Sequence, residues 1–119
     1  AEWLSRDVAV PEAWAKDPMT FVADTMKLLG PIDAARLIGQ PKKLNADIPT
    51  LIMIGSDDSL GGEKSVKKLA DAYLRQGASD VEVIIYDGAR HEIFNETNQA
   101  EVRGDLLAWL QSRLSGASA

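Results

Sequence analysis

The chain of 119 residues has the length of one domain, and its 13 basic and 18 acidic residues give a net charge of −5. With 45% hydrophobic and 26% charged residues, the composition is typical of a globular protein and excludes a disordered one. The acidic balance argues against nucleic acid as a partner and against a polybasic membrane anchor, because both need clustered positive charge.

Cysteine and histidine usage narrows the possible chemistry further. The absence of cysteine excludes disulfides, thiolate metal sites and a cysteine nucleophile, and the single histidine excludes multi-histidine metal sites. We therefore expect no cofactor and no metal. Because no apolar run approaches the length of a membrane span and no signal-peptide pattern opens the chain, we expect no integral membrane segment and a cytoplasmic location.

Residues 1–46 contain no strand-like run and are interrupted by several prolines. The clearest element is a helix over Phe21–Leu29, where apolar residues recur at helical spacing and the pair Gly30-Pro31 marks the end. We expect this segment to consist of helices and loops.

Residues 47–119 alternate between strand and helix patterns. The apolar run Thr50–Ile54 predicts a buried strand that ends at Gly55. A helix over Glu63–Gln76 follows, with apolar residues at helical spacing, and then a second strand over Asp80–Tyr86. Strand, helix and strand in this order predict a right-handed βαβ unit with parallel strands.

After the loop Asp87–Glu96, a final helix is predicted to begin near Asn98, which forms a capping-box-like pattern with Glu101. The apolar face of this helix consists of Val102, Leu106, Trp109, Leu110 and Leu114. The fold class is therefore α/β, with the element order βαβα. Because a parallel sheet needs more than two strands, we expect the chain to be the C-terminal part of a larger protein.

Two side chains with catalytic potential follow the two predicted strands. Asp58 lies just after the first strand, and His91 lies in the loop after the second. Because the carboxyl ends of parallel strands meet at one edge of a sheet, these side chains are placed to meet there. A carboxylate that accepts the imidazole Nδ1–H fixes the tautomer and leaves Nε2 as a base, so the pair is a candidate Asp–His dyad.

The residues around this pair resemble the C-terminal third of an α/β-hydrolase of the monoacylglycerol lipase and lysophospholipase group, among the serine aminopeptidase-like hydrolases. The segment Pro49–Asp58 matches the pattern P-x-L-x-x-x-G-x-x-D, and Gly88–Glu92 matches G-A-x-H-E. The resemblance implies that Asp58 is the acid and His91 the base of a catalytic triad. It also implies that residues 47–119 are part of the hydrolase core and, on a looser resemblance, that residues 1–46 are the remnant of a helical cap.

The nucleophile of such a triad is missing from the sequence, which contains no Gly-x-Ser-x-Gly pattern. The resemblance therefore implies an ester or lipid substrate and a serine supplied by an N-terminal half of the fold. We expect the chain alone to be inactive. Arg90 and Glu92 are expected to fix the loop that carries His91 rather than to contact substrate.

Three weaker signals suggest other sites. The segment Gly61–Ser65 faintly resembles a phosphate-binding loop, but Glu63 interrupts the Gly-Lys-Ser core, and a helix start is the preferred interpretation. Asp57, Asp58 and Asp87 offer carboxylates for Mg²⁺. The third signal is an apolar set that is compatible with an acyl-chain pocket or with ordinary packing: Trp3, Trp14, Phe21, Met26 and Leu29.

Two alternative functions remain open at this point. In the first, the chain is a non-catalytic α/β binding module that binds a partner through an exposed sheet edge and its apolar first segment. In the second, it is one chain of a split or cleaved hydrolase that needs a partner chain. Cooperative folding as a monomer favours the first alternative, and self-association favours the second, because an unpaired strand edge is a template for association.

Overall fold

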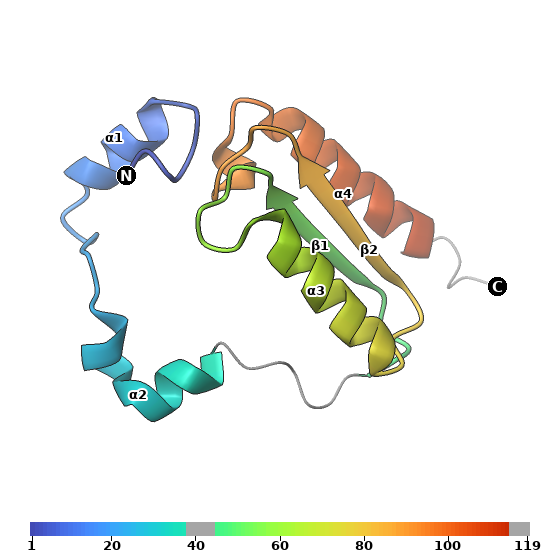
Figure 1. Ribbon diagram of the computed structural model, residues 1–119. Coiled ribbons are helices and arrows are strands. Elements are labelled where there is room, and N and C mark those ends of the chain that lie inside the picture. Colours follow the sequence, from blue (N-terminus) through green and yellow to red (C-terminus); the bar gives the residue numbers. More distant parts are fainter. Residues whose placement is uncertain (38–44, 115–119) are drawn as a thin grey trace.

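The computed structural model describes residues 1–37 and 45–114 (Figure 1). In chain order the elements are α1 (Ala9–Lys16), α2 (Thr25–Leu37), β1 (Thr50–Gly55), α3 (Gly62–Arg75), β2 (Val81–Tyr86), the short 3-10 helix η1 (Ile93–Asn95) and α4 (Gln99–Leu114). The predicted order of strand, helix, strand and helix after residue 46 is confirmed, and each boundary lies within one residue of the prediction.

The two strands form a parallel pair with Thr50 opposite Val81 and Gly55 opposite Tyr86. Because α3 connects them, both strands run in the same direction and end at the same edge of the sheet. The loops after β1 and β2 therefore start side by side, which places the candidate residues at one edge.

Successive side chains of a strand point to opposite faces, so the sheet divides its apolar residues between two helices. One face carries a core cluster formed by Tyr86, Ala89, Ile93 and Val102, with Met53 and Ile84 partly buried against it. Since Val102 belongs to α4, this face is the one that α4 covers. Figure 1 shows α3 on the other face, where it contacts both strands and Ile54 is buried.

The predicted helix over Phe21–Leu29 is wrong at its start. The helix begins at Thr25, because the Asp24 carboxylate accepts a hydrogen bond from the Lys27 N–H (3.2 Å) and so caps the first turn. At Gly30 the backbone is non-helical, with φ 72° and ψ 167°, and the helix resumes at Pro31. The Gly30-Pro31 pair therefore interrupts the helix as predicted, but the chain continues helically after it, since proline is tolerated in a first turn.

The start of α4 agrees with the prediction, but Asn98 and Glu101 pair through their side chains, whereas a capping box binds backbone N–H groups. The Nδ2 of Asn98 donates to the Glu101 carboxylate (2.8 Å), and its Oδ1 accepts from the Arg6 guanidinium (2.9 Å). On the predicted apolar face, Val102 is fully buried, whereas Leu110 and Leu114 are exposed. The apolar face of α4 thus extends beyond the surface that the described residues cover.

The chain is more extended than a compact domain of its length. Its radius of gyration is 16.8 Å, against about 13.5 Å for a compact chain of this size. Among the described residues, β1 and β2 each pair along one side, and α2 lies apart from the sheet (Figure 1). Exposed apolar side chains gather in the N-terminal third: Met19, Phe21, Val22, Met26, Leu28 and Ile32.

Candidate active site

Gly55, the last residue of β1, brings the two loops at the sheet edge into contact. A Cβ built on Gly55 would lie 2.0 Å from the backbone oxygen of Ala89, so any larger residue would collide with backbone. Just after it, the Asp57 N–H donates to the same Ala89 oxygen (2.9 Å). The requirement for glycine in the first motif is therefore a requirement of loop packing.

Asp58 and His91, the two predicted site residues, lie within hydrogen-bond distance. The Nδ1 atom of His91 is 3.0 Å from Oδ2 of Asp58. The other carboxylate oxygen, Oδ1, accepts the backbone N–H of Leu60 (2.8 Å). The structure thus brings together the two residues that the sequence places after successive strands.

The two partners of this hydrogen bond differ in their contact with solvent. The Asp58 side chain is 9% exposed, whereas that of His91 is 39% exposed. With Nδ1–H donated to the carboxylate, the Nε2 atom on the opposite edge of the ring carries a lone pair that is available to accept a proton. The arrangement can therefore act as an oriented general base.

Trp3 lies against the candidate base. Its ring centroid is 5.1 Å from that of His91, with the two planes inclined by 45°. Two backbone hydrogen bonds hold the segments together: the His91 N–H donates to the Trp3 oxygen (3.4 Å) and the Glu92 N–H to the Leu4 oxygen (2.8 Å). The start of the chain is thus a structural part of the site.

Glu96 is a site component that the sequence analysis missed. Its side chain is fully buried, although a glutamate in a polar loop is normally expected at the surface. Burial alone raises the pKa of this carboxyl, but hydrogen bonds from the Arg6 guanidinium and from backbone N–H groups outweigh it and hold the pKa below the usual range. No local pattern signals this role, because Arg6 lies at the other end of the sequence.

Arg90 and Glu92 flank His91, and their side chains contact the start of the chain and the loop itself. The Arg90 guanidinium donates to the backbone oxygens of Glu2 and Ser5, so it ties the loop to the start of the chain. Glu92 accepts a hydrogen bond from Asn95 Nδ2 (2.8 Å), within the loop itself. Both side chains therefore make contacts that restrain the loop around His91.

The two alternative polar sites gain no support from the described residues. Asp57 and Asp87 are exposed, and within residues 1–37 and 45–114 no three acidic or histidine side chains are placed to hold a metal ion together. The segment Gly61–Ser65 forms the start of α3, where Glu63 pairs with Lys67 one turn later. It is thus a helix start, as preferred above.

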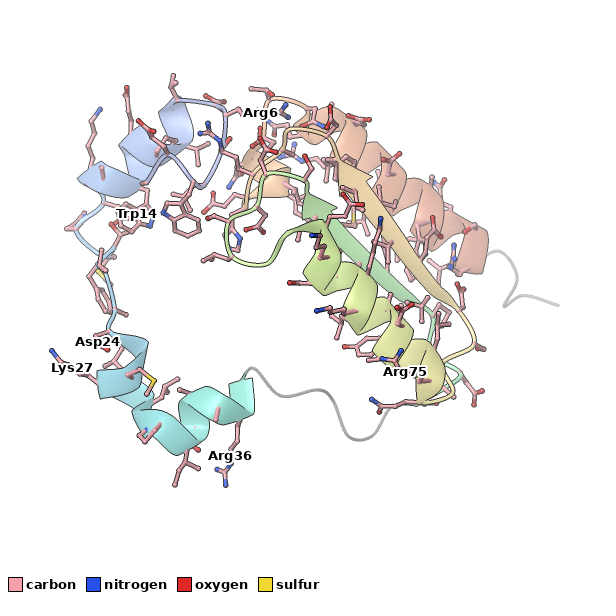
Figure 2. All side chains as sticks on the ribbon, in the orientation of Figure 1. Arg6, Trp14, Asp24, Lys27, Arg36 and Arg75 are labelled. Atoms are coloured by element: carbon pink, nitrogen blue, oxygen red, sulfur yellow. The ribbon has the colours of Figure 1, made fainter. Side chains whose placement is uncertain are left out.

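The proposed apolar set is dispersed. Trp3 contacts His91, whereas Trp14 of α1, labelled in Figure 2, lines a different groove beside Glu92 and Asn95. Phe21 and Met26 are exposed. The described residues therefore do not gather these side chains into one acyl-chain pocket.

None of the described helices combines the length and apolar character needed to cross a bilayer.

Comparison with known proteins places these features in a family. Residues 1–98 match the family model described as serine aminopeptidase, S33. A monoacylglycerol lipase of Mycolicibacterium smegmatis is 34% identical over 118 residues, and the match covers 96% of this chain and 40% of that protein.

A solved structure gives the same result for the fold. The crystal structure of a soluble variant of monoglyceride lipase from Saccharomyces cerevisiae, in complex with a substrate analogue, superposes with a TM-score of 0.70 at 27% identity. The match covers 93% of this chain and 41% of that one, so the chain spans about two fifths of the length of these relatives. The predicted α/β-hydrolase resemblance is confirmed: the chain belongs to the serine aminopeptidase, S33, family, and its βαβα unit is part of an α/β-hydrolase fold.

Proposed function

We propose that this chain supplies the acid and the base of a Ser–His–Asp triad in a hydrolase of carboxylic esters. Asp58 is the acid and His91 the base, and the substrates are lipid-like monoesters, as in lysophospholipases and monoacylglycerol lipases. The observation that carries the proposal is the 3.0 Å contact between Asp58 and His91 at the carboxyl edge of two parallel strands. The names of the two relatives support the substrate class.

In the proposed reaction the nucleophile is a serine from outside these 119 residues. His91 Nε2 takes the proton of that serine as its oxygen attacks the ester carbonyl, and then gives the proton to the departing alkoxide. Water hydrolyses the acyl-enzyme by the same proton transfers. Throughout, Asp58 keeps the Nδ1–H in place and stabilises the imidazolium that forms.

The proposal assigns different parts to the two segments of the chain. Residues 1–46 form the end of a helical cap over the pocket, and residues 47–119 belong to the hydrolase core. Support comes from Trp3, which reaches the imidazole of His91, and from the exposed apolar side chains of the first segment, which suit contact with lipid or with further protein. The remaining strands and the oxyanion donors come from the nucleophile-bearing part.

The test uses the assembled hydrolase, in which the nucleophile-bearing part is present in the same chain or as a second one. Asp58→Asn and His91→Ala are each expected to lower kcat for monoacylglycerol hydrolysis by about 10³-fold or more, because the base loses its orientation or is removed. Asp57→Asn is the matched control, since Asp57 is adjacent and exposed and its carboxylate accepts a hydrogen bond from Ser56 Oγ. Near-normal turnover by the His91 variant would refute the assignment.

A further inference from the structure

The loop that carries His91 (residues 87–98, the His91 loop) is held along its whole length by the start of the chain. The Arg6 guanidinium donates to Asp87 O through Nη1 (3.4 Å), to Glu96 through Nε (2.8 Å) and to Asn98 through Nη2 (2.9 Å). One side chain thus contacts both ends of the loop. Figure 2 shows Arg6 between the N-terminal segment and the loop that leads into α4.

Glu96 is the centre of this arrangement. Its Oε1 accepts the backbone N–H groups of Arg6 (3.0 Å) and Arg90 (2.8 Å). Its Oε2 accepts the Arg6 Nε–H (2.8 Å) and the Thr97 N–H (3.1 Å). Four donors occupy the four acceptor positions of the carboxylate, so the buried charge is fully satisfied.

Two of these donors determine where His91 lies. Arg90 immediately precedes His91, and its N–H is bound to Glu96, while Ala89 and Ile93 on either side are buried in the core cluster. The hydrogen bond to Arg6 N–H fixes the segment whose Trp3 contacts the imidazole. The position of the His91 backbone and the position of its ring therefore both depend on the Glu96 carboxylate.

We propose that Glu96 is a positioning residue for His91, which acts by binding the backbone of residues 6 and 90 with one carboxylate and so keeps the imidazole aligned with Asp58. This inference rests on the proposed function, since it concerns the geometry of the same base. A displacement of about 1 Å at a reacting group costs up to 10²-fold in rate, which sets the size of the effect.

Glu96→Gln tests the inference in the assembled hydrolase. An amide has one acceptor oxygen, so one of the two pairs of N–H donors then faces an NH₂ group. We expect kcat to fall by about 10- to 100-fold while KM changes by less than about threefold, because substrate binding does not need an aligned base. A merely structural role would lower the amount of folded enzyme and leave the turnover per active site unchanged, so active sites are counted by titration.

Two variants serve as controls. Asp80→Asn breaks the ion pair with Arg113 at the opposite end of β2. Like Glu96→Gln, it removes a charged contact, but it does so away from His91. Glu82→Gln removes a carboxylate of β2 that pairs with Arg113, away from the His91 loop. Both are expected to keep kcat within about threefold of the wild type.

The outcomes separate this inference from the proposed function. If His91→Ala is inactive and Glu96→Gln keeps the kcat of the control variants, the positioning role is refuted and the triad assignment stands. If His91→Ala is itself active, the proposed function is refuted, and the positioning role that rests on it is refuted with it. Should Glu96→Gln not fold, Arg6→Lys takes its place, because lysine keeps the positive charge but cannot contact Asp87, Glu96 and Asn98 together. An unchanged kcat in that variant also overturns the inference.

Discussion

At the scale of residues, the site combines a nearly buried carboxylate with a half-exposed imidazole. Asp58 is held from both sides, by His91 and by the Leu60 N–H, so its position does not depend on solvent. His91 is exposed enough for Nε2 to meet a reactant. This division suits an acid that orients and a base that transfers protons.

The hydrogen bond to Asp58 makes a prediction about the tautomer of His91. Because His91 is the only histidine in the 119 residues, selective histidine labelling gives a single imidazole in the nitrogen NMR spectrum of this chain. At a pH where the ring is neutral, we expect the Nδ1–H form to dominate in the wild type. In Asp58→Asn a mixture of tautomers is expected, since an amide either donates or accepts at this position.

Asp57→Asn should leave the wild-type spectrum unchanged, because that carboxylate interacts with Ser56 rather than with the ring. A wild-type spectrum dominated by the Nε2–H form would contradict the geometry on which the dyad is based.

At the scale of elements, the site depends on how closely the loops after β1 and β2 approach. Local pattern predicted both strands, α3 and α4 to within one residue, because each buries a regular apolar face. It did not predict the start of α2, where Asp24 caps the helix and Phe21 and Val22 stay outside it. The apolar spacing continues into Phe21 and Val22, but the helix does not, because both side chains are exposed and packing does not hold them in a helical conformation.

The close approach at Gly55 predicts a large cost for any side chain there. Gly55→Ala would place a Cβ 2.0 Å from Ala89 O, so we expect the free energy of unfolding to fall by about 3 kcal/mol as the loops separate. Gly104→Ala is the matched control, because nothing lies within 4 Å of a Cβ there and alanine favours the helix by about 0.5–1 kcal/mol. Urea denaturation of the two variants measures both changes, and equal stability would refute the packing argument.

At the scale of the whole molecule, the chain exposes surfaces that a self-contained domain buries. The sheet has two strands, and the strand residues other than Ile54, Gly55 and Tyr86 are only partly buried or exposed. Apolar side chains between residues 19 and 32 face solvent. The chain spans two fifths of the length of its relatives, and these features fit the proposal that it packs against a nucleophile-bearing part.

The unpaired strand edges and exposed apolar surface predict that the isolated chain associates with itself. Sedimentation velocity over a wide range of concentrations should show a sedimentation coefficient that rises with concentration, because strand edges and apolar patches pair. Addition of the nucleophile-bearing part should replace the oligomers with one defined complex. A monomer at all concentrations that melts cooperatively would instead support the alternative of a non-catalytic binding module.

Sequence patterns alone predict the α/β class, the order of the elements after residue 46 and the proximity of Asp58 and His91. Each of these depends on local periodicity or on residues at successive strand ends, which a linear pattern records. Only the tertiary structure revealed Glu96 and its contact with Arg6, and it placed Trp3 beside the imidazole. These contacts join residues about 90 positions apart, and the burial of a charge depends on what the fold brings to it rather than on its neighbours in the chain.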